Sequence, residues 1–578
     1  MSSLSRRDFL KLASLTAAST ALAACAPAQQ SAAPSAVANP TSVPTYPPPT
    51  PVAPVPPEEL PDLATIVFGR LAFGARAGER EEFISLGETD EARLQAWVEA
   101  QLQPDLLEDV EFESRYQQAK FETLHKSLAE LVYDHIVNNP YDDNDDRHWQ
   151  WFVLPSDELV EATFLRAVYS RKQLQELLAD FWHNHFNVYG WDEDVTPAFA
   201  SYDRDVIRAN IFGNFRQMLE AMASHPSMLF YLNNRSNSDA GPNENFAREL
   251  FELHTLGAEN YLGVRDPIGV EKDAGGLAIG YVDNDVYEAA RCFTGWRVDD
   301  DIWDGEDDVD KTGSFLYYRP WHDRFNKIIL GRYIPADQPD LKDGRDVLDM
   351  LSAHPGTATY ISRKLCRRFV SDNPPESIVR TAAQTFLDAK DAPDQLRQVY
   401  RAILLSDEFR ATWGGKLKRP FEFAANVLRA LNADFIRLPG GARWTYEMMG
   451  QPIFGHHPPD GYPDTAEAWA NTMATLYGWN FITGITENWL ADDDHPEKTI
   501  HVDVRAETPA DLRSAAAIAD YWIQRIFGRP LSGESRQALV DFLRESASAE
   551  EELSDDHLNW RLPGMVELAL MSPEMRLR

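Results

Sequence analysis

The clearest structural signal in the chain is the segment LQELLADFWHNHF, residues 174–186. Its apolar side chains recur every three or four residues, which places them on one face of an α-helix. The same spacing recurs in residues 246–253 and in residues 361–369. Alternating strand patterns are scarce, and only residues 315–320 and 327–330 could form a short hairpin. The expected fold class is therefore mainly α, a multi-helix globular body with long irregular insertions and at most a small β-hairpin.

Local start and stop signals divide this body into helices. Asp285 and Glu288 fit a capping box that opens a helix ending at Gly295. Pro242 fits the first turn of another helix, which ends at Gly257. Both segments are predicted to be helical between these residues.

Two similar segments, residues 219–226 and 348–355, read LEAMASHP and LDMLSAHP. Each is followed by a tyrosine five residues after its proline. Because proline is tolerated in the first turn of a helix but not in its interior, each proline is expected to end one helix and begin the next. The pair is either a weak internal repeat or two independent uses of the same helix-turn-helix punctuation.

Two long segments are expected to be irregular. Residues 258–284 are rich in glycine, and residues 299–310 carry eight acidic side chains in twelve positions. Carboxylate oxygens could attract Ca²⁺, but Gly305 at position six of an EF-hand loop would put Lys311 where a glutamate ligand is required. A solvated acidic loop is the favoured interpretation of the second segment.

The overall charge excludes one class of partner. The 578 residues include 55 Lys and Arg against 91 Asp and Glu, which gives a formal net charge of −36. A body this acidic repels phosphate, and no basic patch interrupts it, so nucleic acid is excluded as a partner. With 44% hydrophobic and 11% aromatic residues, the chain is globular and long enough for two or more cores of ordinary size.

The N-terminus has the organisation of an export signal, residues 1–24. Arg6 and Arg7 are followed by DFLK, which resembles the twin-arginine (Tat) signal. The apolar stretch that follows has 13 residues, fewer than the roughly 20 that span a bilayer as a helix. Residues 22–25, LAAC, look like a lipobox in which Cys25 becomes the lipidated N-terminus. We expect the protein to be exported and lipid-anchored, either to the outer face of the cytoplasmic membrane or elsewhere in the cell envelope.

The lipidated Cys25 and a proline-rich segment are predicted to form a tether over residues 25–62. The segment after the cysteine holds 12 of the chain's 37 prolines and no charged residue before Glu58. Proline removes the backbone donor and favours extended polyproline geometry, so regular helix or sheet is not expected there. The helical body then occupies residues 63–578.

Only three cysteines are present. With Cys25 lipidated, Cys292 and Cys366 remain, and they could be bridged only if their Cα atoms lie within about 7 Å. Because Tat substrates fold in a reducing compartment before export, two buried thiols are favoured over a disulfide.

Three motifs of this body suggest a family. They are FWHNHFN at residues 181–187, PNENFARELFELHTLG at 242–257 and ARCFTGW at 290–296. Together they resemble the large bacterial family catalogued as domain of unknown function 1800. Shorter matches, among them Lys364-Leu365, extend the resemblance over residues 63–578.

This resemblance implies an exported, mostly helical protein without an assigned activity, often encoded beside a sulfatase-like family. The sequence departs from the family pattern in two places. The segment between Gly257 and Asp285 is longer than usual, and the usual Lys-Gly-Trp motif after Pro-Pro reads PPDGY at residues 458–462. A role inferred from the family for either segment is therefore in doubt.

His183 and His185 are the first candidates for chemistry. In a continuous helix their side chains point about 200° apart and cannot bind one metal, whereas in an extended segment they share a face. His185 also falls on the apolar face of its segment. The alternatives are a core histidine hydrogen-bonded to a backbone carbonyl and a metal or acid/base role.

Glu249 and Glu252 are the second candidates, because their spacing could present two carboxylates to a divalent metal. His254 points elsewhere around the helix and would need ligands from another helix. Arg248 offers a structural alternative, in which it pairs with Glu244 and Glu252 in an i, i+4 ladder. Sequence alone leaves both interpretations open.

His322 and Asp323 form a third candidate pair, with a turn and an ordinary side-chain cap as the alternative. The adjacent His456 and His457 precede Pro-Pro, which favours a polar loop over a site. The sequence has no His-Glu-x-x-His, no Gly-x-Ser-x-Gly, no phosphate-binding Gly-Lys-Ser/Thr loop and no Cys-x-x-Cys.

Two functions follow from these observations. The first is a non-catalytic binding or assembly protein, held at the membrane by its lipid, whose partner is an exported sulfatase-like protein or a surface polysaccharide. Aromatic residues such as Trp149 and Trp151 could stack on sugars if they are exposed, although core packing is their commoner use. The second is a hydrolase that uses a divalent metal such as Zn, Mn or Fe. Its ligands or acid/base pair would come from His183, His185, Glu249, Glu252 and His254.

Overall fold

The computed structural model describes residues 60–142, 144–273, 275–300, 312–490 and 498–578. The predicted export signal with Arg6 and Arg7, the lipidation site Cys25, and the proline-rich segment up to residue 59 lie outside the described residues. Residues 301–311, which include most of the acidic loop, also lie outside them.

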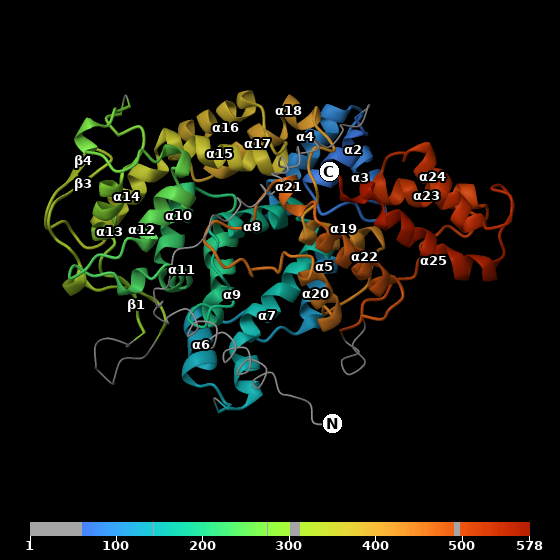
Figure 1. Ribbon diagram of the computed structural model, residues 1–578, viewed down its shortest axis with the longest axis horizontal. Coiled ribbons are helices and arrows are strands. Elements are labelled where there is room, and N and C mark those ends of the chain that lie inside the picture. The colour runs from blue at the N-terminus through green and yellow to red at the C-terminus, as the bar shows by residue number, and fades with distance from the viewer. Residues whose placement is uncertain (1–59, 143, 274, 301–311, 491–497) are drawn as a thin grey trace, which may run out of the picture. The chain divides into compact units, whose positions relative to one another are not determined.

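The described part is mainly α-helical, which confirms the predicted fold class (Figure 1). The helices of the first half are α2 (Leu63–Arg70), α3 (Glu79–Ser85), α4 (Asp90–Gln101), α5 (Val110–Ala119), α6 (Leu128–Val132), α7 (Asp146–Tyr169), α8 (Gln173–His185), α9 (Phe199–Ser201), α10 (Phe215–Ser224), α11 (Pro226–Tyr231), α12 (Asn245–Glu249) and α13 (Asp283–Cys292). Those of the second half are α14 (Lys342–Ser352), α15 (Pro355–Phe369), α16 (Glu376–Asp388), α17 (Gln395–Leu404), α18 (Asp407–Arg410), α19 (Pro420–Ala430), α20 (Gly440–Glu447), α21 (Ala466–Trp469), α22 (Thr472–Thr486), α23 (Ala515–Phe527), α24 (Gly533–Arg544) and α25 (Asp555–Met571).

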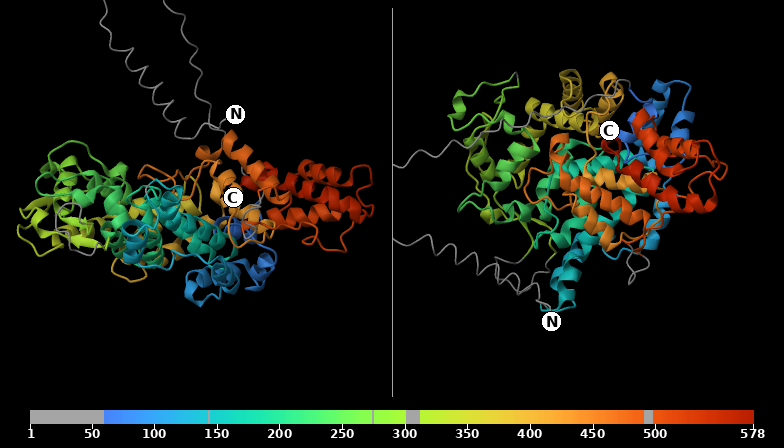
Figure 2. Two further views of the ribbon diagram at one scale, coloured as in Figure 1. Left: turned by 90° about the horizontal axis from the view of Figure 1, so that it is seen from below. Right: turned by 45° about the vertical axis from the view of Figure 1, so that its right-hand side comes forward.

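Helices that follow one another in sequence pack in local groups. Helices α15, α16 and α17 lie side by side, and so do α23, α24 and α25 near the end of the chain (Figure 1). Figure 2 shows the second group, in red, from two further directions. The buried apolar side chains of the described residues nevertheless form one continuous core. The two or more separate cores that the chain length allowed are not what the structure has.

Helix α8 lies in this core, as its periodicity predicted. Trp182 is completely buried, and its indole Nε1 donates a hydrogen bond to the Tyr400 hydroxyl at 2.8 Å. The Tyr400 hydroxyl in turn donates to the carbonyl oxygen of Ile211 at 2.8 Å. Satisfying the polar atoms of both rings lets these large side chains enter the core without an unpaired donor.

The strands are short and pair differently from the expectation. β1 (Trp296–Val298) pairs antiparallel with β2 (Phe315–Tyr317), and β3 (Lys327–Ile329) pairs antiparallel with β4 (Arg332–Ile334). The two segments that were predicted to form one hairpin with each other therefore belong to separate two-stranded sheets. β3 pairs with β4 because a tight turn at Leu330 and Gly331 joins them directly, whereas β2 pairs with β1 across a longer connection.

Two predicted helix starts are displaced. α13 begins at Asp283, and Asp285 in its first turn accepts a hydrogen bond from the backbone N–H of Val282 at 2.9 Å, so Asp285 is not the N-cap. α12 begins at Asn245 rather than at Pro242, because the Asn243 side chain accepts a hydrogen bond from the Asn245 N–H at 3.0 Å and forms a turn there. The chain then continues as a π-helix over Leu250–His254.

The punctuation predicted at the two His-Pro sequences is confirmed. α10 ends before His225 and α11 begins at Pro226, and α14 and α15 are divided in the same way at His354 and Pro355. In both cases Nδ1 of the histidine accepts a hydrogen bond from the backbone N–H two residues later. The imidazole is therefore the N-cap of the second helix.

Cys292 and Cys366 are both buried and free, as favoured for a protein that folds before export. Burial raises the pKa of the Cys366 thiol to about 12 and that of Cys292 well above its usual value. Among the described helices, none combines the length and the apolar character that crossing a membrane requires.

Candidate functional site

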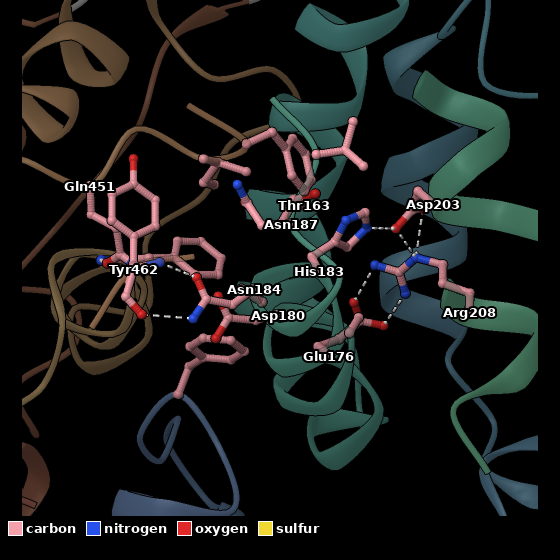
Figure 3. Close-up of a pocket in the computed structure, with 17 residues that line it drawn as sticks. Thr163, Glu176, Asp180, His183, Asn184, Asn187, Asp203, Arg208, Gln451 and Tyr462 are labelled. Carbon is pink, nitrogen blue, oxygen red and sulfur yellow. Dashed lines mark hydrogen bonds and ion pairs between the residues drawn. The ribbon is translucent and has the colours of Figure 1, made fainter. Parts of the chain in front are cut away.

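Helix α8 continues through His183 and His185, so the two imidazoles point to different sides and do not meet at one centre. His183 Nε2 lies 2.9 Å from Oδ1 of Asp203 (Figure 3). Arg208 binds the same carboxylate and also forms two hydrogen bonds, at 3.0 and 2.9 Å, with Glu176. Although burial opposes ionisation, Arg208 and His183 hold the pKa of Asp203 well below its usual range. His183 therefore belongs to a closed network of paired charges.

The cavity beside His183 is small. Its volume is about 50 Å³, and Asn184, Asn187 and Thr163 are among the residues that line it (Figure 3). This space suffices for a few water molecules and not for a substrate. His183 therefore lies beside a small cavity and is held by Asp203.

His185 faces the other side of α8 and is locked to His254. The Nε2–H of His185 donates to the carbonyl oxygen of His254 at 3.1 Å, and the Nδ1–H of His254 donates to the carbonyl oxygen of His185 at 3.2 Å. Because a carbonyl oxygen only accepts, Nε2 of His185 carries the proton and Nδ1 is left as an acceptor. That Nδ1 accepts a hydrogen bond from Nζ of Lys364 on α15 at 2.9 Å.

Lys364 lines a pocket of about 430 Å³, which we call the Lys364 pocket. Helix α8 contributes Phe181, Asn184 and His185 to its wall, and α15 contributes Tyr360, Lys364, Arg367 and Arg368. Leu253, Arg419 and residues of the loop 456–464 complete the lining. The volume lies in the range that holds small molecules in other proteins. Segments that are far apart in the sequence therefore converge here.

Two asparagines hold the 456–464 loop at the pocket: Asn184 in α8 and Asn187 just after the end of this helix. The Asn184 side chain donates to the carbonyl oxygen of Tyr462 at 2.8 Å and accepts from the Tyr462 N–H at 2.7 Å (Figure 3). Asn187 Nδ2 donates to the carbonyl oxygens of His456 and Pro458, at 2.9 and 2.7 Å. The histidines of this motif were predicted as candidate site residues from the sequence, whereas neither asparagine was.

Gly461 allows the loop to approach α8 closely. Its φ is +73°, and a Cβ atom at this position would lie 2.1 Å from the carbonyl oxygen of Asn184. Any other residue would therefore clash with the helix as well as adopt an unfavourable backbone conformation. The segment PPDGY, residues 458–462, places this glycine in the pocket wall.

The cations of the Lys364 pocket fall into two groups. Arg368 and Arg419 are buried and share the carboxylate of Asp180, and Arg368 also pairs with Glu422. In contrast, Lys364 and Arg367 form no ion pair with any residue that the structure describes. Arg367 donates only to a backbone carbonyl oxygen, at 3.2 Å. Two positive charges of one helix face therefore reach the pocket without a direct ion pair among the described residues, although Asp460 and Asp464 lie in the pocket wall.

Burial lowers the pKa of Lys364 to about 8. Asp464 and Asp460, which also line the pocket, partly oppose this shift, and Arg367 adds to it. The side chain is nevertheless reached by solvent through the pocket. Lys364 is thus a partly desolvated ammonium that a ligand can contact.

The sequence model of a family described as "Protein of unknown function (DUF1800)" matches residues 66–577. The chain belongs to this family. Comparison with curated proteins and with solved structures finds no match. The family match contains every residue of the Lys364 pocket, and the description of the family names no activity.

The acidic candidates do not assemble with the histidines. Arg248 pairs with Glu244 at 2.9 Å, as one side of the predicted ladder, but its other partner is Asp283 at 3.4 Å rather than Glu252. Glu249 is half-buried, and burial together with the neighbouring Glu252 raises its pKa. Within the described ranges, no three His, Cys, Asp or Glu side chains are placed to hold one metal ion.

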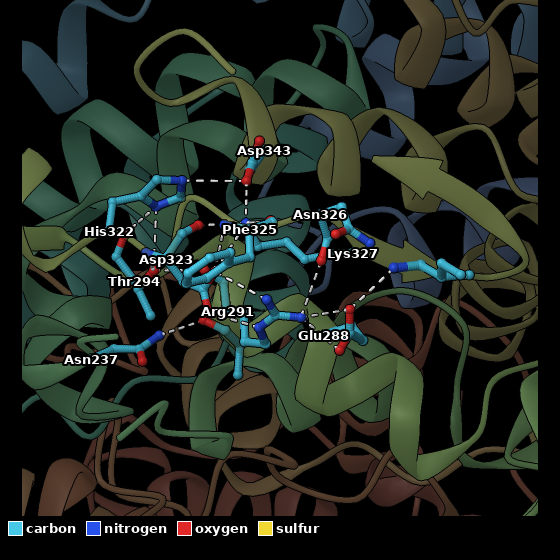
Figure 4. Close-up of polar contacts among 12 residues, drawn as sticks. Asn237, Glu288, Arg291, Thr294, His322, Asp323, Phe325, Asn326, Lys327 and Asp343 are labelled. Atoms are coloured by element: carbon cyan, nitrogen blue, oxygen red, sulfur yellow. Dashed lines mark hydrogen bonds and ion pairs between the residues drawn. The ribbon is translucent and has the colours of Figure 1, made fainter. Parts of the chain in front are cut away.

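His322 and Asp323 belong to a buried network between α13, β3 and α14 (Figure 4). His322 donates to the carbonyl oxygen of Thr294 at 2.9 Å, and its Nε2 lies 3.3 Å from Asp343. Asp323 binds the guanidinium of Arg291 through two hydrogen bonds and also accepts from the N–H of Phe325 at 2.9 Å. The hydrogen bond from the Phe325 N–H to Asp323 is the side-chain cap that was predicted as the alternative to a functional role for His322 and Asp323.

Proposed function

We propose that this protein is an exported, lipid-anchored member of its family that binds an anionic ligand in the Lys364 pocket. The observation that carries the proposal is the pair of cations, Lys364 and Arg367, that lie on one face of α15 without a carboxylate partner among the described residues. Removing an ammonium or guanidinium from water without a counter-ion is unfavourable, and a bound anion offsets that cost.

The charge balance of the pocket favours a ligand with a single negative charge. Arg368 and Arg419 are already occupied by Asp180 and Glu422, so they add little free positive charge. Asp460 and Asp464 also line the wall and would repel a doubly charged phosphate more strongly than a carboxylate or a sulfate ester. Carboxylate and sulfate groups are the anions of acidic cell-surface polysaccharides.

Aromatic side chains support a sugar as the carrier of that anion. Phe181, Tyr360 and Tyr462 line the same pocket, and aromatic faces pack well against the apolar faces of sugar rings. This assigns the first of the two functions inferred from the sequence, a binding protein at the cell surface, to a particular pocket. A metal-dependent hydrolase would need ligands that the described residues do not bring together.

Isothermal titration of the intact protein with glucuronate, with methyl sulfate and with neutral glucose tests the binding proposal. Losing a charge-assisted hydrogen bond costs about 1.5–3 kcal/mol, so Lys364→Met is expected to weaken glucuronate binding about 10- to 100-fold. Arg363→Met is the matched control, because Arg363 lies on the same helix but pairs with Glu376 outside the pocket. Equal affinity of both variants, or no preference for glucuronate over glucose, contradicts the proposal.

Export and lipidation are tested separately. Metabolic labelling with palmitate should mark the protein and should fail for Cys25→Ser. Replacing Arg6 and Arg7 by lysine should leave the precursor in the cytoplasm. Persistent labelling of Cys25→Ser, or unchanged export of the double variant, overturns this part of the proposal.

A further inference from the structure

Lys364 differs from the other buried lysines of the described residues in what its Nζ contacts. Lys327 is held by Asp343 at 2.5 Å, and Lys416 is held by Asp372. Lys418 donates to two backbone carbonyl oxygens, at 2.7 and 3.0 Å. Among the lysines that the structure describes, only Lys364 combines an open pocket with an imidazole as its hydrogen-bond acceptor.

A neutral imidazole is a different partner from a carboxylate. A carboxylate stabilises the ammonium and keeps the lysine protonated, whereas the Nδ1 lone pair of His185 orients Nζ without adding a negative charge. The His254 carbonyl oxygen fixes the other ring nitrogen, so the imidazole cannot rotate away. These contacts fix the direction of the amine and allow it to lose its proton. An amine is a nucleophile only in this neutral state.

We propose that Lys364 is a covalent site, which forms an imine with a ligand that carries an aldehyde or ketone next to a carboxylate, a 2-oxo acid. This inference rests on the proposed anion binding, because Arg367, one turn further along α15, would hold the carboxylate of that ligand. The neutral amine nitrogen forms a bond with the carbonyl carbon. The carbonyl oxygen takes both protons of the amine and leaves as water, and the C=N bond replaces the C=O bond. No oxidant or reductant takes part in this step.

The protonation state of Lys364 supports the step. With a pKa of about 8 instead of the ordinary value near 10.4, the fraction of neutral amine near pH 7.5 is greater on the order of a hundredfold. The charged and titratable groups that act on Nζ are His185, Arg367, Asp460, Asp464 and Glu259, and none of the three carboxylates is its hydrogen-bond partner. Tyr360, whose ring lies 5.4 Å from Nζ, shields the amine on one side.

Trapping of the imine tests this inference. The intact protein is incubated with glyoxylate and sodium cyanoborohydride, which reduces the imine to a stable secondary amine, and the modified lysine is located by peptide mass spectrometry. We expect Lys364 to be modified at least ten times faster than any other lysine, and excess acetate to slow its modification by occupying the anion site.

Lys364→Arg separates this inference from the proposed function. Arginine keeps the positive charge, so glucuronate binding should persist within a few-fold, while the adduct at this position is lost. Wild-type protein that binds glucuronate but is not modified at Lys364 overturns the inference and leaves the anion site standing. Modification of Lys364 no faster than that of surface lysines overturns it as well, and wild-type protein that binds no anion overturns both proposals.

Discussion

His185 and His254 each donate a hydrogen bond from the imidazole ring to the backbone carbonyl oxygen of the other residue, at 3.1 and 3.2 Å. The end of α8 and the end of the π-helix over Leu250–His254 are joined by this reciprocal contact. Both rings are buried, and burial lowers the pKa of His254 to about 3 and that of His185 well below its usual value. The pair is therefore neutral in the folded protein, and it fixes the imidazole that contacts Lys364.

The first prediction concerns the pH dependence of stability. The pKa of His254 in the unfolded chain is about 6.5, so the unfolded state binds more protons as the pH falls below that value, and stability decreases toward the folded pKa of about 3. His254→Asn keeps a donor for the His185 carbonyl oxygen and removes the titration. Between pH 7 and pH 5 the wild-type protein should lose about 2 kcal/mol of unfolding free energy more than the variant. Urea denaturation at the two pH values measures the unfolding free energy of each protein. Equal losses of unfolding free energy in the wild-type protein and the variant would show that His254 is charged in the folded state.

The second prediction concerns Gly461. Gly461→Ala places a Cβ atom against the carbonyl oxygen of Asn184 in a backbone conformation with φ of +73°, so the 456–464 loop has to move. We expect a loss of about 1–3 kcal/mol in unfolding free energy together with weaker glucuronate binding. Gly533→Ala is the control, because no atom lies within 4 Å of its added Cβ and the residue begins α24. Equal stability of the two variants contradicts the assigned role.

The third prediction concerns Asn187. Asn187→Ala removes both hydrogen bonds to the carbonyl oxygens of His456 and Pro458. Amide hydrogen exchange in residues 456–464 should become faster by about tenfold or more, since each lost bond is worth about 1 kcal/mol. Asn210→Ala, which removes a hydrogen bond to Val206 away from this loop, should leave that exchange unchanged. Unaltered exchange in Asn187→Ala means that other contacts hold the loop.

The fourth prediction concerns the thiols. Cys292 and Cys366 are buried, free and of raised pKa, so neither should react with a maleimide in the folded protein. Both should react once the chain is unfolded in guanidinium without a reducing agent. Intact mass spectrometry distinguishes this outcome from a disulfide, in which no thiol becomes available on unfolding.

Much of the fold could be predicted from local sequence alone. The three- and four-residue spacing in residues 174–186 predicted α8 and the burial of Trp182, because a helix face is set by side chains within two turns of each other. The two His-Pro sequences likewise predicted helix boundaries that the structure has. The strand pairing and the starts of α12 and α13 were mispredicted, since single hydrogen bonds such as that from Asn245 to Asn243 shift an element by several residues.

The sequence by itself determined that the body is helical and that His185 falls on the apolar face of its helix, because both depend on periodicity within one segment. Only the tertiary structure decided that Nδ1 of His185 accepts a hydrogen bond from Lys364, which lies 179 positions away in the sequence. The same is true of the hydrogen bonds by which Asn184 and Asn187 hold the loop of residues 456–464. A pocket consists of groups from separate segments whose distances are set by the packing of the whole core. For this reason no local spacing rule could single out Lys364.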